Sequence, residues 1–444
     1  MDTDIKSKRG GWGSNFGFLM ASIGSAVGLG NIWGFPYKMG KSGGAVFLLF
    51  YLVLVVLVGV TVMLGELALG RRSGKSGVST YRALSKKYTW LGYAGVLCGF
   101  CIMCFYFVLG GIVLRYTVGY FLSLFGGSTF AWSGQGTDFF GYFLTDTKSM
   151  ILFFVLYILL NIIVVSGGVH GGIEKFCNIG MPALFCLLVF IIAYIACQPG
   201  AAEGYKFMFT PRWEALKDPM IWVWAMGQAF FSLSVTGSGM IVYGAYLSKD
   251  EDVVDVAQHT ALFDTIAAVV AALVIIPACF SYGQDVGAGP SLLFVTLPTI
   301  LQDIPLGRLF AVILYVAMIF AGVSSLQNMF EAVAESLQHK FPKLSRAAVL
   351  GILCVLCLGF GLLMEPISKW GPWMDFVSIY IIPIGATLGA ISWFYVMKKD
   401  DLLDAVNTGS RRHRGAVWYS VGRYVYVPLA LVLCCVALFM SVSF

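Results

Sequence analysis

Long apolar segments separated by short polar loops extend along almost the whole chain. A helix needs about 17 to 25 residues to cross the hydrocarbon layer of a bilayer, and these segments have that length or more. Eleven are expected to span the membrane, at residues 13–36, 43–70, 91–124, 150–166, 174–198, 220–247, 256–283, 306–337, 346–364, 373–397 and 420–443. The pattern therefore predicts a single all-α transmembrane domain over residues 1–444.

Composition and charge distribution support a membrane protein. Of the 444 residues, 59% are hydrophobic and 12% are charged, whereas a soluble globular protein carries about 25% charged residues. Most of the 29 lysines and arginines fall on cytoplasmic segments if the N-terminus is cytoplasmic, and cytoplasmic loops are enriched in both residues. We expect a cell-membrane protein with a cytoplasmic N-terminus and an extracellular C-terminus. The net charge of +6 then reflects topology and does not indicate nucleic-acid binding.

Two spans contain polar and glycine-rich runs at mid-membrane depth. The first span contains GSAVGLGN, which ends at Asn31, and the sixth contains SLSVTGSG, which begins at Ser232. Small residues also allow helices to pack closely in membranes, but packing does not account for Asn31. Transporters with two inverted five-helix halves place their ligands between such interrupted helices. We therefore expect inverted repeats over about 10–200 and 218–400, with an extra helix over 420–443.

A third polar cluster lies in the eighth span, where Ser324 and Ser325 are adjacent. On its own, such a pair is more typical of hydrogen bonding to helix carbonyls. Together with the two interrupted spans, its hydroxyl oxygens favour a sodium site. Acidic residues at membrane depth are functional candidates by default, and the predicted spans contain Asp264, Glu66, Glu331, Glu335 and Asp375.

These motifs together resemble the neurotransmitter:sodium symporter family, in particular its bacterial eleven-helix amino-acid branch. The resemblance rests on GSAVGLGNIW in the first span, GELALGR ending the second, QAFFSLS in the sixth and AGVSS in the eighth, together with Arg9 and Trp12. It implies sodium-coupled symport of an amino acid by alternating access, through helices 1 and 6 unwound at mid-membrane. It also implies two sodium ions, no organic cofactor and no enzymatic activity.

The resemblance assigns ligand roles to individual positions. One implied sodium site consists of Gly24, Val27, Ala321, Ser324 and Ser325, and the other of Ala26, Asn31, Ser232, Asp264 and the carboxylate of the substrate. The implied substrate contacts are Ala26, Leu29, Gly30, Ile102, Tyr106, Phe231, Ser232, Ser234, Gly237, Ser325 and Met329. Monoamine carriers of the family have an aspartate where this chain has Gly28, so the glycine predicts a substrate that brings its own carboxylate.

The size of the substrate is predicted from Gly237. Leucine-selective relatives place a phenylalanine against the substrate side chain at this position, so a glycine there would open room. The sequence therefore predicts large hydrophobic or aromatic amino acids as substrates. The alternative is that Gly237 only permits a different backbone path, with Ser238 or Met240 occupying the space.

Several positions depart from the family pattern. Gly34 stands where the family has the arginine of the outer gate, whose partner would be Asp375, and Lys38 lies about one turn further out as a candidate substitute. The family has an acidic partner for Arg9 after the eighth span, and this chain has His339 at that position.

Asp264 replaces an asparagine of the family in the seventh span. Its carboxylate would supply the negative charge that chloride-dependent relatives take from solution. The sequence therefore predicts transport that does not need chloride.

Three other functions are compatible with parts of the pattern. A sodium-independent or proton-coupled carrier of the same architecture would share the interrupted helices but not the paired sodium ligands. An intramembrane enzyme would need a Ser/Lys, Ser/His or paired-aspartate arrangement, and none is visible in the sequence. A transporter-like receptor would bind the amino acid without moving it. The partners expected are the amino acid, sodium and the lipid bilayer; the identity of the amino acid and the oligomeric state are unspecified.

Overall fold

The computed structural model describes residues 13–75, 77–126, 140, 146–287, 289, 292–303, 305–364 and 367–439, without the side chains of residues 303, 367, 368 and 375. In this part of the chain every regular element is helical, and the one β-type contact is an isolated bridge between Gly44 and Pro211. The predicted all-α class is therefore confirmed. Arg9 and Trp12 lie outside the described residues.

Helices follow one another along the chain, with short π-helical or 3-10 turns marked η. The first half contains α2 (Asn15–Ala26), η1 (Gly30–Gly34), α3 (Phe35–Lys41), α4 (Ala45–Leu54), η2 (Val55–Gly59), α5 (Val60–Ser73), α6 (Gly77–Leu84), η3 (Lys86–Tyr88), α7 (Thr89–Leu124), α9 (Thr147–Ser166), η4 (Val169–Glu174), α10 (Lys175–Ile195), α11 (Ala201–Phe209) and η5 (Trp213–Lys217). The second half contains α12 (Met220–Ser232), α13 (Gly239–Ala245), α14 (Val253–Ser281), η6 (Leu292–Thr296), α15 (Leu297–Asp303), α16 (Gly307–Lys340), α17 (Arg346–Met364), α18 (Ile367–Asp375), η7 (Phe376–Ile381), α19 (Ile382–Ile391), η8 (Ser392–Val396), α20 (Lys399–Asn407), α21 (Ala416–Ser420), η9 (Val421–Tyr426) and α22 (Val427–Phe439).

The predicted spans correspond closely to these helices. Within the described ranges, nine helices are long and apolar enough to cross a membrane, and the bent pair Asn15–Ala26 and Gly30–Lys41 gives a tenth. The predicted span 346–364 coincides with α17, and the predicted span 91–124 begins two residues inside α7. The predicted sixth span is divided into α12 and α13, which have 13 and 7 residues and are each too short to cross alone.

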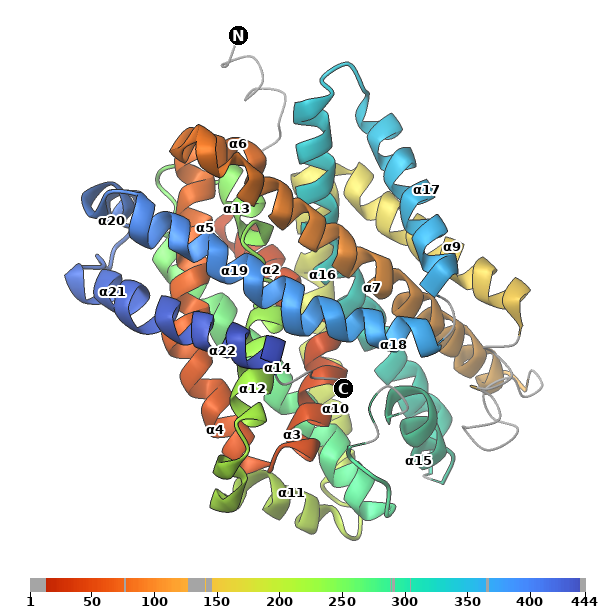
Figure 1. Cartoon of the computed structure of the whole chain (residues 1–444). Coiled ribbons are helices and arrows are strands. Elements are labelled where there is room, and N and C mark those ends of the chain that lie inside the picture. The colour runs from red at the N-terminus through yellow and green to blue at the C-terminus, as the bar shows by residue number, and fades with distance from the viewer. Residues whose placement is uncertain are drawn as a thin grey trace.

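The helices form one bundle, in which α7 and α16 pack along each other through the centre. Helix α6 and the loop between α16 and α17 lie at one end of the bundle, while α11 and α15 lie at the other (Figure 1). The short helices α6, α11, α15 and α20 connect the long ones and were not predicted as spans. The bundle therefore has two opposite ends, as a membrane-spanning protein requires.

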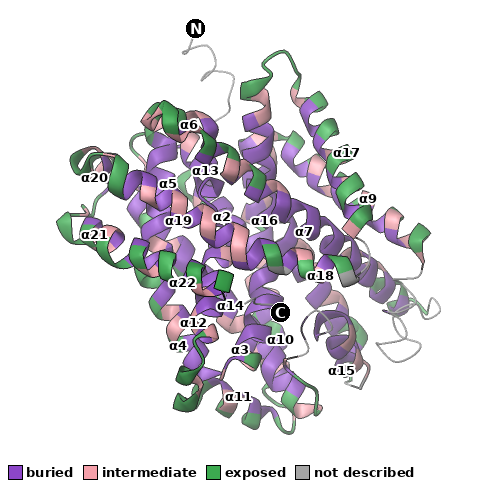
Figure 2. Ribbon diagram, viewed as in Figure 1, coloured by how far each residue is buried: buried purple, intermediate pink, exposed green. Residues whose placement is uncertain are grey.

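Large apolar side chains are exposed on the outer faces of the bundle, and several polar side chains are buried within its apolar interior. Val355 on α17 and Ile163 on α9 are 71% and 70% exposed, whereas Asn31, Asp264 and Glu66 are fully buried. Buried residues fill the centre of the bundle and exposed ones lie on its outer faces and ends (Figure 2). An outer surface of large apolar side chains suits lipid as the surrounding solvent.

Candidate functional site

The first break follows α2, where the chain leaves helical geometry at Val27, with ψ of 103°. Helix resumes at Gly30, and the two segments are inclined by 49°. The side-chain oxygen of Asn31 accepts the backbone N–H of Gly28 at 2.9 Å, replacing a bond that the helix loses. A buried amide without a partner is costly in hydrocarbon, which explains why an asparagine stands in this apolar span.

The second break separates α12 from α13 over residues 233–238. Ser234 and Gly237 both have positive φ, 54° and 84°, a conformation that is costly for most residues and easily adopted by glycine. The fully buried carboxylate of Glu66 accepts the N–H groups of Gly237 and Met240, each at 2.8 Å. Tyr81 donates its hydroxyl hydrogen to the Gly237 carbonyl. The break is thus held by side chains from α5 and α6.

We expect Glu66→Ala to destabilise the protein, because two buried amides lose their acceptor and each costs about 1–3 kcal/mol when left without one. The midpoint of thermal unfolding, measured on the purified protein, should fall by several degrees, with a smaller fall for Glu66→Gln. Glu203→Ala, at an exposed position of α11, is the matched control. Equal midpoints for Glu66→Ala and Glu203→Ala would show that Glu66 does not support the break.

A buried carboxylate joins the two breaks. The Asn31 side-chain amide donates to Asp264 Oδ1 at 2.7 Å, and Ser232 Oγ lies 2.8 and 2.7 Å from the two carboxylate oxygens. Tyr51 donates its hydroxyl hydrogen to Asp264 Oδ2 at 3.2 Å. All three neighbours donate, as an ionised carboxylate requires. Three predicted ligands of one sodium site, Asn31, Ser232 and Asp264, are therefore in contact.

No sequence motif predicted a role for Tyr51. It lies in the second span, in the run AVFLLFYLVLVV, where it is the one side chain with a hydrogen-bonding group. A lone tyrosine in such a run is a usable signal, because its buried hydroxyl usually has a partner.

Ser25 connects the two breaks to α16. Its backbone carbonyl accepts the hydroxyl of Ser234 at 2.5 Å and that of Ser325 at 3.1 Å. Its own Oγ accepts the side-chain amide of Asn328 at 2.6 Å. The hydroxyls of Ser234 and Ser325, both predicted substrate contacts, therefore donate to the same carbonyl. Ser25 and Asn328 had no predicted role.

Gly28 faces two hydroxyl groups. A Cβ atom at Gly28 would lie 2.8 Å from Ser325 Oγ and 2.9 Å from the Tyr106 hydroxyl oxygen, so a side chain there would crowd both hydroxyls. The same tyrosine hydroxyl interacts with the backbone amides of Leu29 and Gly30. Hydroxyl and amide donors are therefore grouped where helix resumes at η1, and the dipole of a helix start also favours an anion.

Apolar side chains adjoin this group of donors. The Phe231 ring lies 6.0 Å from the Tyr106 ring, centroid to centroid, and packs directly against Gly30. Ile102 and Met329 are buried and lie one helical turn from Tyr106 and Ser325, on the same faces of α7 and α16.

The predicted second sodium site is only partly defined. Ser324 Oγ donates to the carbonyls of Phe320 and Ala321 at 2.7 and 3.1 Å. This is the hydrogen bonding to helix carbonyls that is the alternative to sodium binding for such a serine pair. Gly24 packs against Ser324, since a Cβ atom there would lie 3.0 Å from the serine Cβ. Val27 and Ala26 are buried at the end of α2. Gly24, Ala321 and Ser324 are thus neighbours.

Gly237 packs against the backbone of another span. A side chain there would point at the backbone of Gly385 in α19 and overlap its carbonyl group. The position therefore needs glycine for close packing against α19 and for its positive φ. The reasoning that Gly237 opens room for a large substrate is not supported by this geometry, which corresponds to the alternative of a different backbone path.

Lys38 connects α3 to α12. Its buried ammonium donates to Gln228 Oε1 at 2.9 Å, and Gln228 Nε2 donates to the Gly30 carbonyl at 3.0 Å. A Cβ atom at Gly34 would lie 3.4 Å from the same Gln228 Oε1. Lys38 therefore bonds to the same Gln228 side chain that a side chain at position 34 would contact. The side chain of Asp375 lies outside the described part of the chain.

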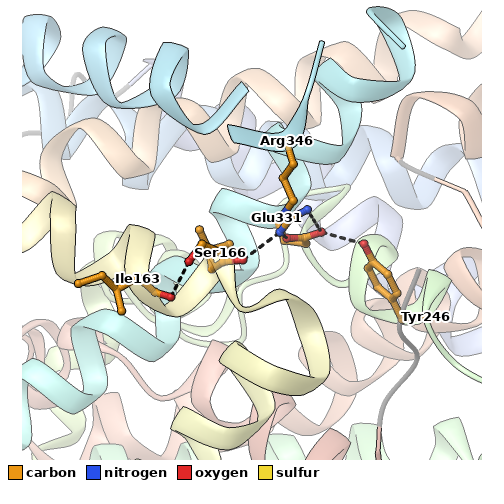
Figure 3. Close-up of polar contacts among 6 residues, drawn as sticks. Ile163, Ser166, Tyr246, Glu331 and Arg346 are labelled. Carbon is orange, nitrogen blue, oxygen red and sulfur yellow. Dashed lines mark hydrogen bonds and ion pairs between the residues drawn. The ribbon is translucent and has the colours of Figure 1, made fainter. Parts of the chain in front are cut away.

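A charged cluster lies in the C-terminal part of α16 (Figure 3). The Arg346 guanidinium contacts the Glu331 carboxylate at 2.6 and 3.2 Å, and Tyr246 donates to Glu331 Oε1 at 2.7 Å. Arg346 also donates to the Val165 carbonyl at 3.1 Å. The buried charge of Glu331 is paired, and the cluster joins the end of α13 to α16 and α17.

Comparison with known proteins agrees with this geometry. The model of the sodium:neurotransmitter symporter family matches residues 9–139 and 134–443. The chain is 33% identical over 442 residues to YhdH, an uncharacterized sodium-dependent transporter of Bacillus subtilis (strain 168), covering 95% of this chain and 96% of that one. It is 26% identical over 457 residues to the sodium- and chloride-dependent GABA transporter ine of Drosophila melanogaster, covering 88% of this chain and 47% of that one.

A solved structure is also similar over almost the full length. The crystal structure of MhsT in complex with L-phenylalanine superposes with a TM-score of 0.88 at 32% identity, covering 97% of this chain and 100% of that one. The interrupted helices, the buried polar centre and these matches converge on one assignment: the chain is a multi-pass membrane protein of the sodium:neurotransmitter symporter family.

Proposed function

We propose that this protein is a sodium-coupled symporter of a large hydrophobic or aromatic amino acid that works by alternating access. The observation that carries the proposal is Gly28, which lacks a side chain opposite the hydroxyls of Tyr106 and Ser325. A substrate carboxylate fits this position, because the donors of Tyr106, Leu29 and Gly30 are grouped beside it. The substrate ammonium would meet backbone carbonyls of the breaks, such as those of Ala26 and Phe231.

The coupling ion in this proposal is sodium, bound at two sites. Asn31, Ser232 and Asp264 supply oxygens beside the substrate carboxylate, which would itself complete the coordination of one ion. The ion supplies the positive charge that makes a desolvated carboxylate tolerable. Sodium and substrate then each raise the affinity for the other by the same factor. The second ion would bind Ser324, Ser325 and the carbonyls of Gly24, Val27 and Ala321.

We also propose eleven spans in two inverted repeats. Joined across the break at residues 233–238, α12 and α13 make a sixth span, five spans after the bent pair formed by α2 and α3. Interrupted helices at corresponding places of two halves are typical of inverted-repeat transporters. The basic loops put the N-terminus in the cytoplasm and the C-terminus outside the cell.

The preference for a large apolar side chain rests on the apolar neighbours of Gly28. Ile102, Phe231 and Met329 adjoin Tyr106 and Ser325, and a flexible thioether adapts to rings of different shape. An aromatic side chain buries about 150–250 Å², which favours binding against an apolar wall. The phenylalanine complex of MhsT is consistent with this preference. A sodium-independent or proton-coupled carrier of the same architecture is the second candidate.

A thermal-shift screen of the twenty amino acids, on purified protein in sodium and in a large inert cation, tests the proposal. We expect phenylalanine, tyrosine, tryptophan and leucine to raise the unfolding midpoint in sodium and to have little effect without it. Glycine and alanine should have weaker effects. Stabilisation of equal size in both cations would favour the sodium-independent carrier.

The sodium ligands are tested by replacing Ser324 and Ser325 together with alanine. Loss of two hydroxyl ligands should weaken sodium-dependent binding of the amino acid about tenfold, since each net bond is worth about 0.5–1.5 kcal/mol. Ser336→Ala is the matched control, because its hydroxyl makes the same bond to the carbonyl four residues back on α16, at 2.7 Å. Equal effects of the control and the double variant would contradict the sodium assignment.

A further inference from the structure

A groove of about 890 Å³ opens on the surface of the bundle, and its lining includes none of the candidate site residues. It lies between α4, η2 and α5 on one side, α14 on another and the start of α21 on the third. Most of its lining is aliphatic, and the outward-facing Val56 and Leu262 are 66% and 54% exposed. A groove of this kind on a lipid-facing surface suits an acyl chain.

The length of the groove agrees with that occupant. Its lining positions from Leu52 to Leu64 cover about 18 Å of helix at about 1.5 Å per residue. Half of the hydrocarbon core of a bilayer measures about 15 Å. The groove therefore extends over about one leaflet.

Polar groups gather at the end formed by α21. Arg414 and Trp418 both line the groove there, together with Gln258 of α14. Arg414 Nε and Trp418 Nε1 are buried donors, and neither has a hydrogen-bond partner within the described part of the chain. A buried donor without an acceptor costs about 1–3 kcal/mol. A ligand with acceptor oxygens would remove this cost.

The loop that carries Arg414 is held in place. Asn407 accepts the backbone N–H of Arg414 at 2.7 Å and donates to its carbonyl at 2.9 Å. Asp252, before α14, accepts the backbone N–H of Arg411 at 2.8 Å. The loop is therefore anchored at both Arg411 and Arg414, and Arg414 is the basic residue of the loop that lines the groove.

We propose that this groove is a binding site for an anionic phospholipid. One acyl chain lies along Leu52, Val56 and Leu262, and the phosphate accepts hydrogen bonds from Arg414 and Trp418. Basic pockets between transmembrane helices bind anionic headgroups in this way. The placement of this site in the cytoplasmic leaflet rests on the orientation proposed above. Lipid binding itself depends neither on that orientation nor on transport.

Retention of added phosphatidylglycerol and phosphatidylcholine on the purified full-length protein, measured by native mass spectrometry, tests the proposal. Phosphatidylglycerol should be retained in preference, and Arg414→Ala should lower its retention about fivefold, as expected for the loss of one basic contact. Arg412→Ala removes the same charge from an exposed position of the loop and should have a much smaller effect. Equal losses in the two variants would overturn the proposal.

The apolar half of the site is tested by Leu262→Trp, which fills the groove and leaves Arg414 in place. This variant should also lose phosphatidylglycerol, whereas Leu156→Trp, on the outer face of α9, should not. Unchanged retention in Leu262→Trp would overturn the proposal, even if Arg414→Ala did not fold. Displacement of the lipid by inorganic phosphate would also overturn the proposal. So would conversion of a dimer to a monomer by Leu262→Trp without loss of lipid. Sodium-dependent binding of the amino acid is measured separately, so that failure of the lipid site and failure of the transport proposal are distinguishable.

Discussion

Replacing Gly28 by aspartate is expected to abolish binding of amino acids. The new carboxylate would lie against Ser325 Oγ and the Tyr106 hydroxyl, 2.8 and 2.9 Å from the added Cβ. It would occupy the position proposed for the substrate carboxylate and repel it. Like charges placed together cost several kcal/mol, so affinity for phenylalanine should fall about 100-fold or more, measured as sodium-dependent binding.

Steric and electrostatic effects at Gly28 are separated by the choice of ligand. An aromatic amine without a carboxylate should bind the Gly28→Asp variant better than phenylalanine does, because the new aspartate replaces the missing charge. Gly99→Ala on α7 is the control, since its added Cβ would meet Val333 at an ordinary 3.7 Å. If phenylalanine remained the better ligand of Gly28→Asp, the carboxylate position proposed here would be wrong.

Transport is expected to continue when chloride is replaced by gluconate. Two sodium ions and a zwitterionic substrate leave excess positive charge in a buried site, and the Asp264 carboxylate offsets part of it. Asp264→Asn removes that charge, so its uptake in proteoliposomes without chloride should fall at least about tenfold, because an uncompensated buried charge costs about 3–5 kcal/mol. Chloride should restore part of the uptake of the variant.

Asp255→Asn is the matched control for Asp264, because it changes an exposed carboxylate on the same helix. Its uptake should not depend on chloride. Loss of native uptake in gluconate would mean that Asp264 does not replace the anion. In that case its bonds to Asn31, Ser232 and Tyr51 would serve only to join helices.

Contacts between distant segments were decided only by the tertiary structure. Glu66 was recognised as an unusual buried acid, but its bonds to Gly237 and Met240 join positions more than 170 residues apart. The direction of Gly237 follows from its positive φ and from the approach of Gly385. A backbone angle and a neighbour on another span leave no trace in local sequence, so the sequence could not show where a side chain at position 237 would point.

The sequence by itself determined the all-helical class, the positions of most long helices and the interruption of the first and sixth spans. The length of an apolar segment and the small number of polar residues within it can be read from local sequence, because every span must cross the hydrocarbon layer. Only the tertiary structure decided which polar groups meet, such as Tyr51 with Asp264, Lys38 with Gln228, and Arg346 with Glu331. Burial makes each of these groups require a partner, but packing of distant helices determines which partner it finds.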